Sequence, residues 1–373
     1  MFEILMLLSV IYCILSLFFL CVSILINIKF SQKFYNYFLG GLILSLTIIA
    51  FFTYPNPGSD LSRYYVELSI LKNISLQQAL LNSLYSSTPL TTIFFWIIAQ
   101  VGIFNLLPCL ATSISFILIF KVLLEEKKIV HLSNQLFSLF ILLFICIFSL
   151  RAALTGVRQI TSYALLLLAV YIDFFSQKKY TSGLKLFLYL LPVLVHMGTL
   201  PYLLLRIIII FIKDRSKIYL IALWCILIPF FDFLANNSNE LIRSSYEKLL
   251  GYSEIDYPDI RLLIVKIIVF VLFGYLLHKN KRIYEKKYNQ YIRYSLSILC
   301  FGIGAFSVPH LFDRTINFFI LIGLPFFSSG LHNIDNKRKY IAYVILFVLI
   351  FGLLLYWFVD LKSSWRLIPV IYR

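Results

Sequence analysis

Residues 184–212 read LKLFLYLLPVLVHMGTLPYLLLRIIIIFI, and this stretch decides the class of fold. It is longer than the roughly 20 apolar residues that one membrane-spanning helix needs. Its middle, His-Met-Gly-Thr at 196–199, has a proline on either side. Proline and glycine interrupt helices, so the pattern predicts two helices that turn back at 196–199. Residues 207–212 are apolar on every face, which excludes the alternating pattern of an outer-membrane β-barrel.

The rest of the chain has the same character. Of its 373 residues, 61% are hydrophobic and only 13% are charged, and the mean hydropathy is +0.90. These residues supply too little polar surface to cover soluble domains, so a soluble enzyme is excluded. The prediction is an all-α polytopic integral membrane protein whose residues 1–373 form a single transmembrane domain. Residues 1–27 have no basic start and no small-residue cleavage site, so they are expected to be a retained first helix.

The net charge of +16 is carried by short basic clusters between the apolar runs. Lys and Arg accumulate in short cytoplasmic loops, so these clusters predict the topology. If all of them are cytoplasmic, an even number of crossings separates each cluster from the next, and the count is about twelve transmembrane helices with both termini outside. The clusters are Lys29/Lys33, Lys127/Lys128, Lys178/Lys179, Lys213/Arg215/Lys217, Lys279 to Lys287 and Lys337/Arg338/Lys339.

The requirement for an even number of crossings between basic clusters also assigns the less regular segments. Leu90–Leu107 is long enough to cross, but a crossing there would turn Lys127 and Lys128 outward, so we expect a re-entrant or interfacial helix. The run from 293 to 330 must fold back on itself, and Pro309 to Arg314 is the expected place. Residues 54–107 and 235–260 are then predicted to be periplasmic loops.

Ionisable side chains near the outer ends of these helices are the candidates for chemistry, because charges at membrane depth are costly and usually line a cavity. On one side of the membrane they could converge on one site. They are Asp60, Arg63, Arg151, Arg158, His196, His310, Asp313 and Arg314.

Each candidate also has a structural interpretation. Ser59 or Asp60 with Arg63 can be an ordinary helix cap, and Tyr64 and Tyr65 suit either sugar stacking or the interfacial aromatic belt. Arg151 and Arg158, the latter followed by Gln159, can snorkel toward lipid phosphate. His196 can be a hydrogen-bonded helix cap, and Asp313 can form a local ion pair with Arg314, close to His310.

Several classes of site are missing from the sequence. It contains no phosphate-binding loop, no dinucleotide fingerprint, no H-E-x-x-H and no G-x-S-x-G. The six cysteines lie in apolar segments without a C-x-x-C pair, so neither a disulfide framework nor a zinc site is indicated. We expect no metal, no cofactor and no nucleic-acid partner.

Four short motifs together resemble a known family. They are an outward Gly-x-Asp-x-x-x-Tyr-Tyr (Gly58, Asp60, Tyr64, Tyr65), Val157-Arg158-Gln159 opening an apolar helix, His196 at a helix end, and Arg314 leading an aromatic helix with Phe318 and Phe319. In this order, over Pro57 to Phe327, they resemble the EpsG-like, Wzy-type polymerases of bacterial surface polysaccharide. The sequence departs from that pattern at Phe52-Thr53-Tyr54, where an arginine often precedes the acidic loop.

The resemblance implies polymerisation of lipid-linked repeat units, as in O-antigen or lipopolysaccharide biosynthesis, at the periplasmic face of the bacterial inner membrane, on a GT-C-like glycosyltransferase architecture. The donor would be a glycan on undecaprenyl diphosphate, and membrane lipids and a chain-length regulator would be partners. Three arginines, Arg151, Arg158 and Arg314, suit the leaving diphosphate, because a guanidinium donates in bidentate fashion.

His196 or Asp60 suits the base that activates the acceptor hydroxyl. Three further classes of protein stay open: a flippase for lipid-linked oligosaccharides, which should carry charges along a path across the membrane, a membrane O-acyltransferase, and an O-antigen ligase that uses the same donor.

Overall fold

The computed structural model describes residues 2–26, 31–53, 55, 59–81, 88–147, 156–176, 180–211, 260–279, 286–305 and 309–332, and every regular element in these ranges is helical. The described residues divide into two compact units, the first up to Leu203 and the second from Leu204 onward. The helices of the first unit are α1 (Phe2–Ile26), α2 (Gln32–Phe51), α3 (Asp60–Leu71), α4 (Leu76–Leu81), α6 (Pro89–Val101), α7 (Leu106–Ile129), α8 (Asn134–Ile147), α10 (Val157–Phe174), α11 (Ser182–Val195) and the 3-10 turn η1 (Met197–Thr199), after which α12 (Leu200–Phe211) crosses the boundary between the units.

Among the described residues, four helices are long and apolar enough to cross a membrane, and they lie at Ile4–Ile24, Lys33–Phe51, Leu106–Ile129 and Val157–Phe174. This confirms a helical membrane protein. The count of about twelve crossings remains a prediction, because it depends partly on segments outside the described residues. The single transmembrane domain and the periplasmic loop at 235–260, which lies almost wholly outside the described ranges, also remain predictions.

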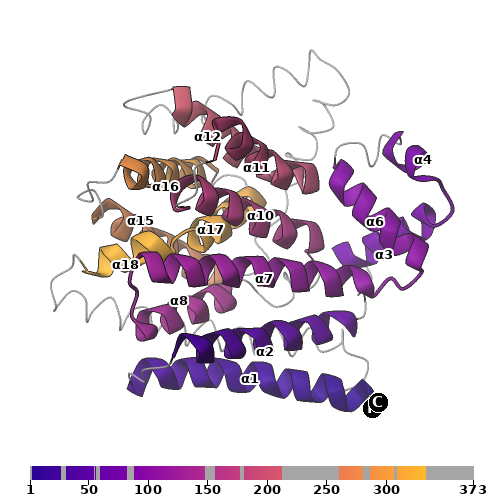
Figure 1. Ribbon diagram of the computed structural model, residues 1–373, viewed down its shortest axis with the longest axis horizontal. Coiled ribbons are helices and arrows are strands. Elements are labelled where there is room, and N and C mark those ends of the chain that lie inside the picture. The colour runs from indigo at the N-terminus through magenta and orange to yellow at the C-terminus, as the bar shows by residue number, and fades with distance from the viewer. Residues whose placement is uncertain are drawn as a thin grey trace. The chain divides into compact units, whose positions relative to one another are not determined.

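In the first unit α7 packs against both α2 and α10, and α1 packs on α2 (Figure 1). One polar contact between α7 and α10 is the hydrogen bond from Ser115 Oγ to Thr161 Oγ1 at 3.2 Å. At the other end of α7 the ammonium of Lys127 lies 4.3 Å from the ring centroid of Tyr35 on α2 and donates to Asn134 Oδ1 at 2.8 Å. A buried lysine is thus held by a ring and an amide oxygen instead of water.

The segment 54–107 was expected to be a loop with one helix, and its described residues contain three short helices before α7 begins. Figure 1 shows α3, α4 and α6 together near the start of α7. α6 ends at Val101 because Gly102 follows in the left-handed conformation at φ 78°, which is a common helix stop. With 13 residues α6 is shorter than the roughly 20 that a span needs, in keeping with the predicted interfacial or re-entrant helix.

The turn predicted from the opening stretch is present. α11 ends at Val195, η1 occupies Met197–Thr199, and α12 follows. α10 and α11 form a hairpin in which the buried carboxylate of Asp173 accepts from Lys185 Nζ at 3.2 Å and from Tyr189 Oη at 3.4 Å.

The second unit contains α15 (Ile260–Lys279), α16 (Lys286–Gly304), α17 (Pro309–Leu321) and α18 (Leu324–His332) around buried phenylalanines such as Phe273 and Phe319. The predicted fold-back at 309–314 is displaced. These residues form the first turns of α17, which begins at Pro309, while α16 ends at Gly304. A proline fits the first position of a helix because its missing N–H has no partner there in any case.

Candidate functional site

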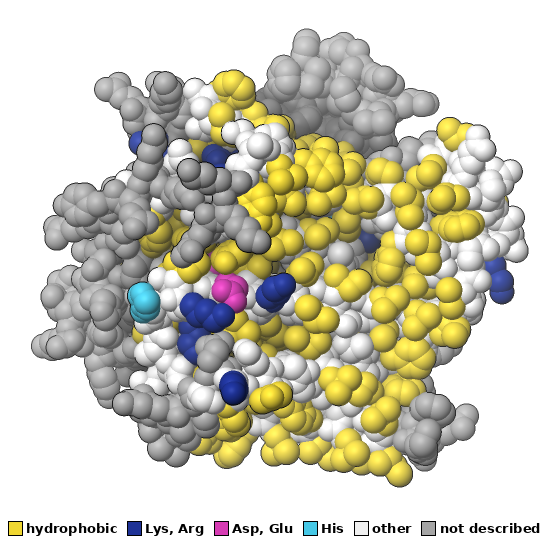
Figure 2. Space-filling view, viewed as in Figure 1, with side chains coloured by type: hydrophobic (Ala, Val, Ile, Leu, Met, Phe, Trp, Pro, Cys, Tyr) yellow, Lys and Arg dark blue, Asp and Glu magenta, His cyan; other side chains and the backbone are white. Residues whose placement is uncertain are grey.

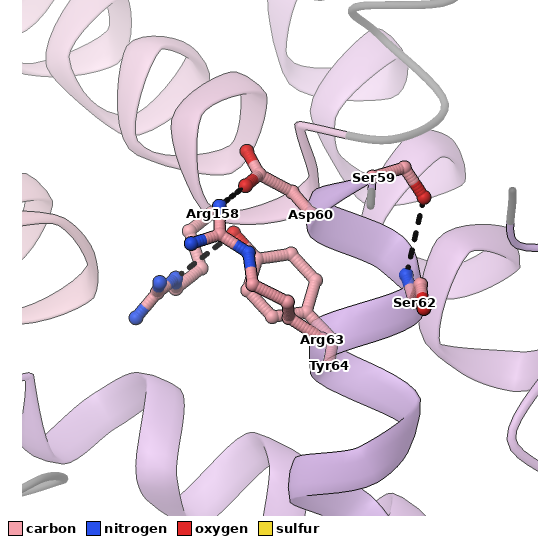
Figure 3. Close-up of polar contacts among 6 residues, drawn as sticks. All are labelled: Ser59, Asp60, Ser62, Arg63, Tyr64 and Arg158. Atoms are coloured by element: carbon pink, nitrogen blue, oxygen red, sulfur yellow. Dashed lines mark hydrogen bonds and ion pairs between the residues drawn. The ribbon is translucent and has the colours of Figure 1, made fainter. Parts of the chain in front are cut away.

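The start of α3 is a capped helix terminus. Ser59 has extended backbone angles, and its hydroxyl accepts from Ser62 N at 3.3 Å. Asp60 lies in the first turn, where a carboxylate is favoured by the helix dipole. Arg63, one turn later, forms an ion pair with Asp60 (Figure 3). The structural interpretation of these residues as a helix cap is therefore correct, and it leaves the Asp60 and Arg63 side chains at the surface.

Tyr64 and Arg158 join α3 to the start of α10. Tyr64 is buried, and its ring packs edge-on against Phe95 of α6 at a centroid distance of 5.3 Å. Arg158 Nε donates to Tyr64 Oη at 3.1 Å, and the guanidinium carbon lies 4.9 Å from the Tyr64 ring centroid. Figure 3 shows Arg63 and Arg158 reaching from their two helices toward the same edge of α3.

The guanidinium of Arg158 is half-buried, and Tyr64 is its one hydrogen-bond partner in the part of the chain that the structure describes. The Nε–H of Arg158 is therefore used, while the N–H groups of its two terminal nitrogens remain available to donate hydrogen bonds. A half-buried guanidinium with donors to spare is suited to an anionic ligand that presents two oxygens.

Glu67 is a further member of this cluster that the sequence analysis missed. Burial raises the pKa of the Glu67 carboxyl, and the positive charge of Arg158 opposes that rise. Positions 60, 63, 64 and 67 fall on one face of α3 by helical spacing. That spacing from Asp60 and Tyr64 was a signal in the sequence that could have identified Glu67. The cluster thus contains two guanidiniums and two carboxyl groups.

Tyr65 and Gln159 have structural contacts instead. Tyr65 Oη donates to Asn105 Oδ1 at 2.8 Å, its ring packs edge-on against Phe104, and burial raises the pKa of its hydroxyl. Gln159 Nε2 donates to Tyr163 Oη at 3.3 Å within α10. Their assignment to substrate binding stays a prediction, and Arg151 lies outside the described residues.

His196 terminates α11 and lies on the same side of the first unit as Arg158. Its backbone N donates to Pro192 O at 2.8 Å, and its carbonyl accepts from Thr199 Oγ1 at 2.8 Å. From the Asp173–Lys185 contact, His196 lies about 16 Å along α11 and Arg158 about 22 Å along α10, at 1.5 Å per residue. Since the two helices run antiparallel, His196 lies near the end of α10 that carries Arg158.

α6 contacts both α3 and the end of α11 that carries His196. Thr91 Oγ1 donates to Val195 O at 2.6 Å, and Phe95 packs against Tyr64. Thr91 and Phe95 are one turn apart, so the same face of α6 contacts both α3 and the end of α11. A mainly apolar core that includes Leu61, Leu68, Ile98 and Val157 supports this arrangement from behind.

The remaining candidates belong to the second unit. Asp313 forms an ion pair with Lys266 of α15 and accepts from Asn317 Nδ2 at 3.3 Å. The sequence analysis had named Arg314 as the ion-pair partner of Asp313. His310 and Arg314 lie on the same helix, α17. Convergence of these three residues with Asp60 and Arg158 stays a prediction. Among the described residues no three His, Cys, Asp or Glu side chains group as metal ligands.

The fold and the site together define the class of protein. It is an all-α integral membrane protein, and it has a cluster of arginine, tyrosine and carboxylate side chains near its surface. Residues 36–370 match the EpsG family, and the chain belongs to that family. This confirms the resemblance stated from the sequence motifs, and membership suggests a polysaccharide polymerase-type role. No curated protein and no solved structure matches the chain.

Proposed function

We propose that this protein is a glycosyltransferase that polymerises lipid-linked oligosaccharide repeat units. It transfers a glycan from undecaprenyl diphosphate to the non-reducing end of another lipid-linked repeat unit, at the periplasmic face of the cytoplasmic membrane. Membership of the EpsG family supports a polymerase. The charged cluster on α3 and α10 supports a reaction that releases an anionic leaving group.

The contact between Arg158 and Tyr64 carries the proposal. When the glycosyl bond breaks, negative charge grows on the departing lipid diphosphate, and a fixed cation stabilises this charge more than it stabilises the ground state. Tyr64 holds the Nε of Arg158, so the guanidinium is oriented before substrate arrives. Arg63, at the surface beside Asp60, supplies a second cation at the same edge of α3.

The acceptor hydroxyl must lose its proton as the new bond forms. We assign that proton to His196, since imidazole titrates near neutral pH and His196 lies near the end of α10 that carries Arg158. Asp60, already paired with Arg63, is assigned to orient the acceptor sugar. Tyr64 then serves as a positioning residue for Arg158.

The test uses full-length protein in lipid nanodiscs, supplied with purified undecaprenyl-diphosphate repeat units. We expect a ladder of glycans that lengthens by one repeat unit. Arg158→Lys keeps the positive charge but loses the planar fork, so it should lose most of the polymer, while Arg293→Lys, at an exposed arginine of α16, should keep it.

Two results would contradict the proposal. Glycan transferred to a lipid A acceptor without any ladder would indicate a ligase. Movement of repeat units across the membrane without bond formation would indicate a flippase. A wild-type ladder in Arg158→Lys would leave polymerisation standing but remove the diphosphate role of Arg158.

A further inference from the structure

A groove lies between α2 and α7, at the end of α7 opposite the charged cluster of α3. On the α2 side it is lined by Asn36, Leu39, Gly40 and Ile43. On the α7 side it is lined by Ile117, Phe120, Lys121, Leu124, Glu125 and Lys128. None of these residues belongs to the proposed catalytic cluster.

The groove changes from polar to apolar along its length. α2 and α7 run antiparallel in the predicted topology, so Asn36 lies level with Lys128 and Glu125, while Ile43 lies level with Ile117. The polar end coincides with the basic cluster that predicts the cytoplasmic side. A charged mouth that leads into an apolar channel within the membrane matches a lipid with a polar headgroup and an acyl chain.

The charges that line the groove favour a negatively charged headgroup. Lys128 Nζ is paired with Glu125 Oε1 at 2.7 Å, so these two charges compensate each other. Lys121 is exposed and has no hydrogen bond or ion pair within the described ranges. The lining therefore has one uncompensated positive charge. Figure 2 shows basic side chains near an acidic one, with hydrophobic surface beside them.

The groove also has unfilled space at its apolar wall. A Cβ added to Gly40 would meet no atom within 4 Å. Nearby side chains that line or border the groove face outward, with Leu44 61% and Ile117 47% exposed. In a membrane, surface of this kind is covered by acyl chains.

We propose that this groove binds one anionic glycerophospholipid of the cytoplasmic leaflet, with its phosphate at Lys121 and an acyl chain along Gly40 and Ile43. The inference does not depend on the polymerase function, since the groove shares no residue with the cluster of α3 and α10. It does depend on the chain being a membrane protein, which the apolar helices support.

Native mass spectrometry of the full-length protein, delipidated and then offered phosphatidylglycerol or phosphatidylcholine, tests the proposal. We expect one tightly held phosphatidylglycerol and no equivalent phosphatidylcholine. Gly40→Leu should abolish this adduct by filling the channel. Lys121→Gln should weaken it about fivefold, since a lysine near an anionic surface contributes about that factor.

Lys33→Gln is the matched control, because Lys33 is an exposed lysine on α2 that does not line the groove. It should bind phosphatidylglycerol as the wild type does. Equal retention of both lipids, or full retention of phosphatidylglycerol by either Gly40→Leu or Lys121→Gln, would overturn the proposal. Displacement of the adduct by inorganic phosphate would also overturn it, because that result indicates an anion site without an acyl-chain channel. Lys121→Gln changes a surface side chain and keeps the test informative if Gly40→Leu does not fold.

Discussion

Replacing Tyr64 by Phe isolates the contribution of one hydroxyl to the placement of Arg158. The ring stays, so its packing on Phe95 at 5.3 Å and its position under the guanidinium at 4.9 Å are retained. What is lost is the 3.1 Å hydrogen bond from Arg158 Nε. A hydrogen bond to a charged group contributes about 1.5–3 kcal/mol, and water can replace part of it because Arg158 is half-buried. We therefore expect a loss of about 1.4 kcal/mol, which is about tenfold in polymerisation rate.

A double-mutant cycle shows whether this loss acts through Arg158. Initial rates of ladder formation are measured for Tyr64→Phe, Arg158→Lys and the double variant. If Tyr64 only positions the guanidinium, the double variant is hardly slower than Arg158→Lys, and the two effects fail to add by about 1 kcal/mol. Effects that add to within about 0.5 kcal/mol would refute the reasoning.

Tyr189→Phe is the matched control for this cycle. Tyr189 is also buried and also loses a hydrogen bond to a charged group, Asp173, but at the other end of the α10–α11 hairpin. It should lower the melting temperature without slowing polymerisation. An equal fall in rate in both variants would mean that the Tyr64→Phe effect is general destabilisation.

Four further outcomes are expected. Ser59→Ala removes the cap of α3 and should cost about 1 kcal/mol of stability, read as a lower melting temperature, and an unchanged melting curve would show that the cap adds nothing. Burial raises the pKa of Glu67, so the folded chain holds that proton more tightly than the unfolded chain and stability falls as pH rises above about 4.3. Glu67→Gln should then melt higher than wild type at neutral pH and equally at about pH 4, and a difference independent of pH would contradict this sign. In a cysteine-free background, a maleimide that does not cross membranes should label a cysteine at Arg63 in intact spheroplasts and one at Lys128 only after permeabilisation, and the reverse pattern would invert the topology. Polymerisation should continue in EDTA, whereas activity lost in EDTA and restored by Mg²⁺ would require a metal.

The parts of the fold that local chemistry determines could be predicted. Proline and glycine around 196–199 predicted the break between α11 and α12, and Ser59 predicted the cap of α3. The stop of α6 was placed too late, because the apolar pattern continues past Gly102 while its left-handed backbone ends the helix. The break near Pro309 was placed too late as well, since proline begins a helix as readily as it ends one.

The sequence predicted which residues belong to the candidate site better than it predicted which of them contact one another. Asp60, Arg63 and Arg158 were candidates because charges near apolar helices are costly. That Arg158 would meet Tyr64, 94 residues away in sequence, depends on how α3 and α10 pack, and helical spacing alone carries no such information. Glu67 was missed for a related reason, since a single acidic residue in an amphipathic helix usually faces water.

The two contacts of α6 have a consequence for how the site can be altered. Thr91 holds the end of α11 and Phe95 holds Tyr64, one turn apart on one rigid helix. Two uncharged side chains of α6 therefore contact both the end of α11 that carries His196 and the helix α3 that carries Tyr64. A larger or smaller residue at either position would move α3 or the end of α11 while leaving the chemical identity of every ionisable group unchanged. If the proposed function holds, substitutions at Thr91 and Phe95 should change which sugars are accepted without altering the residues that carry the charge.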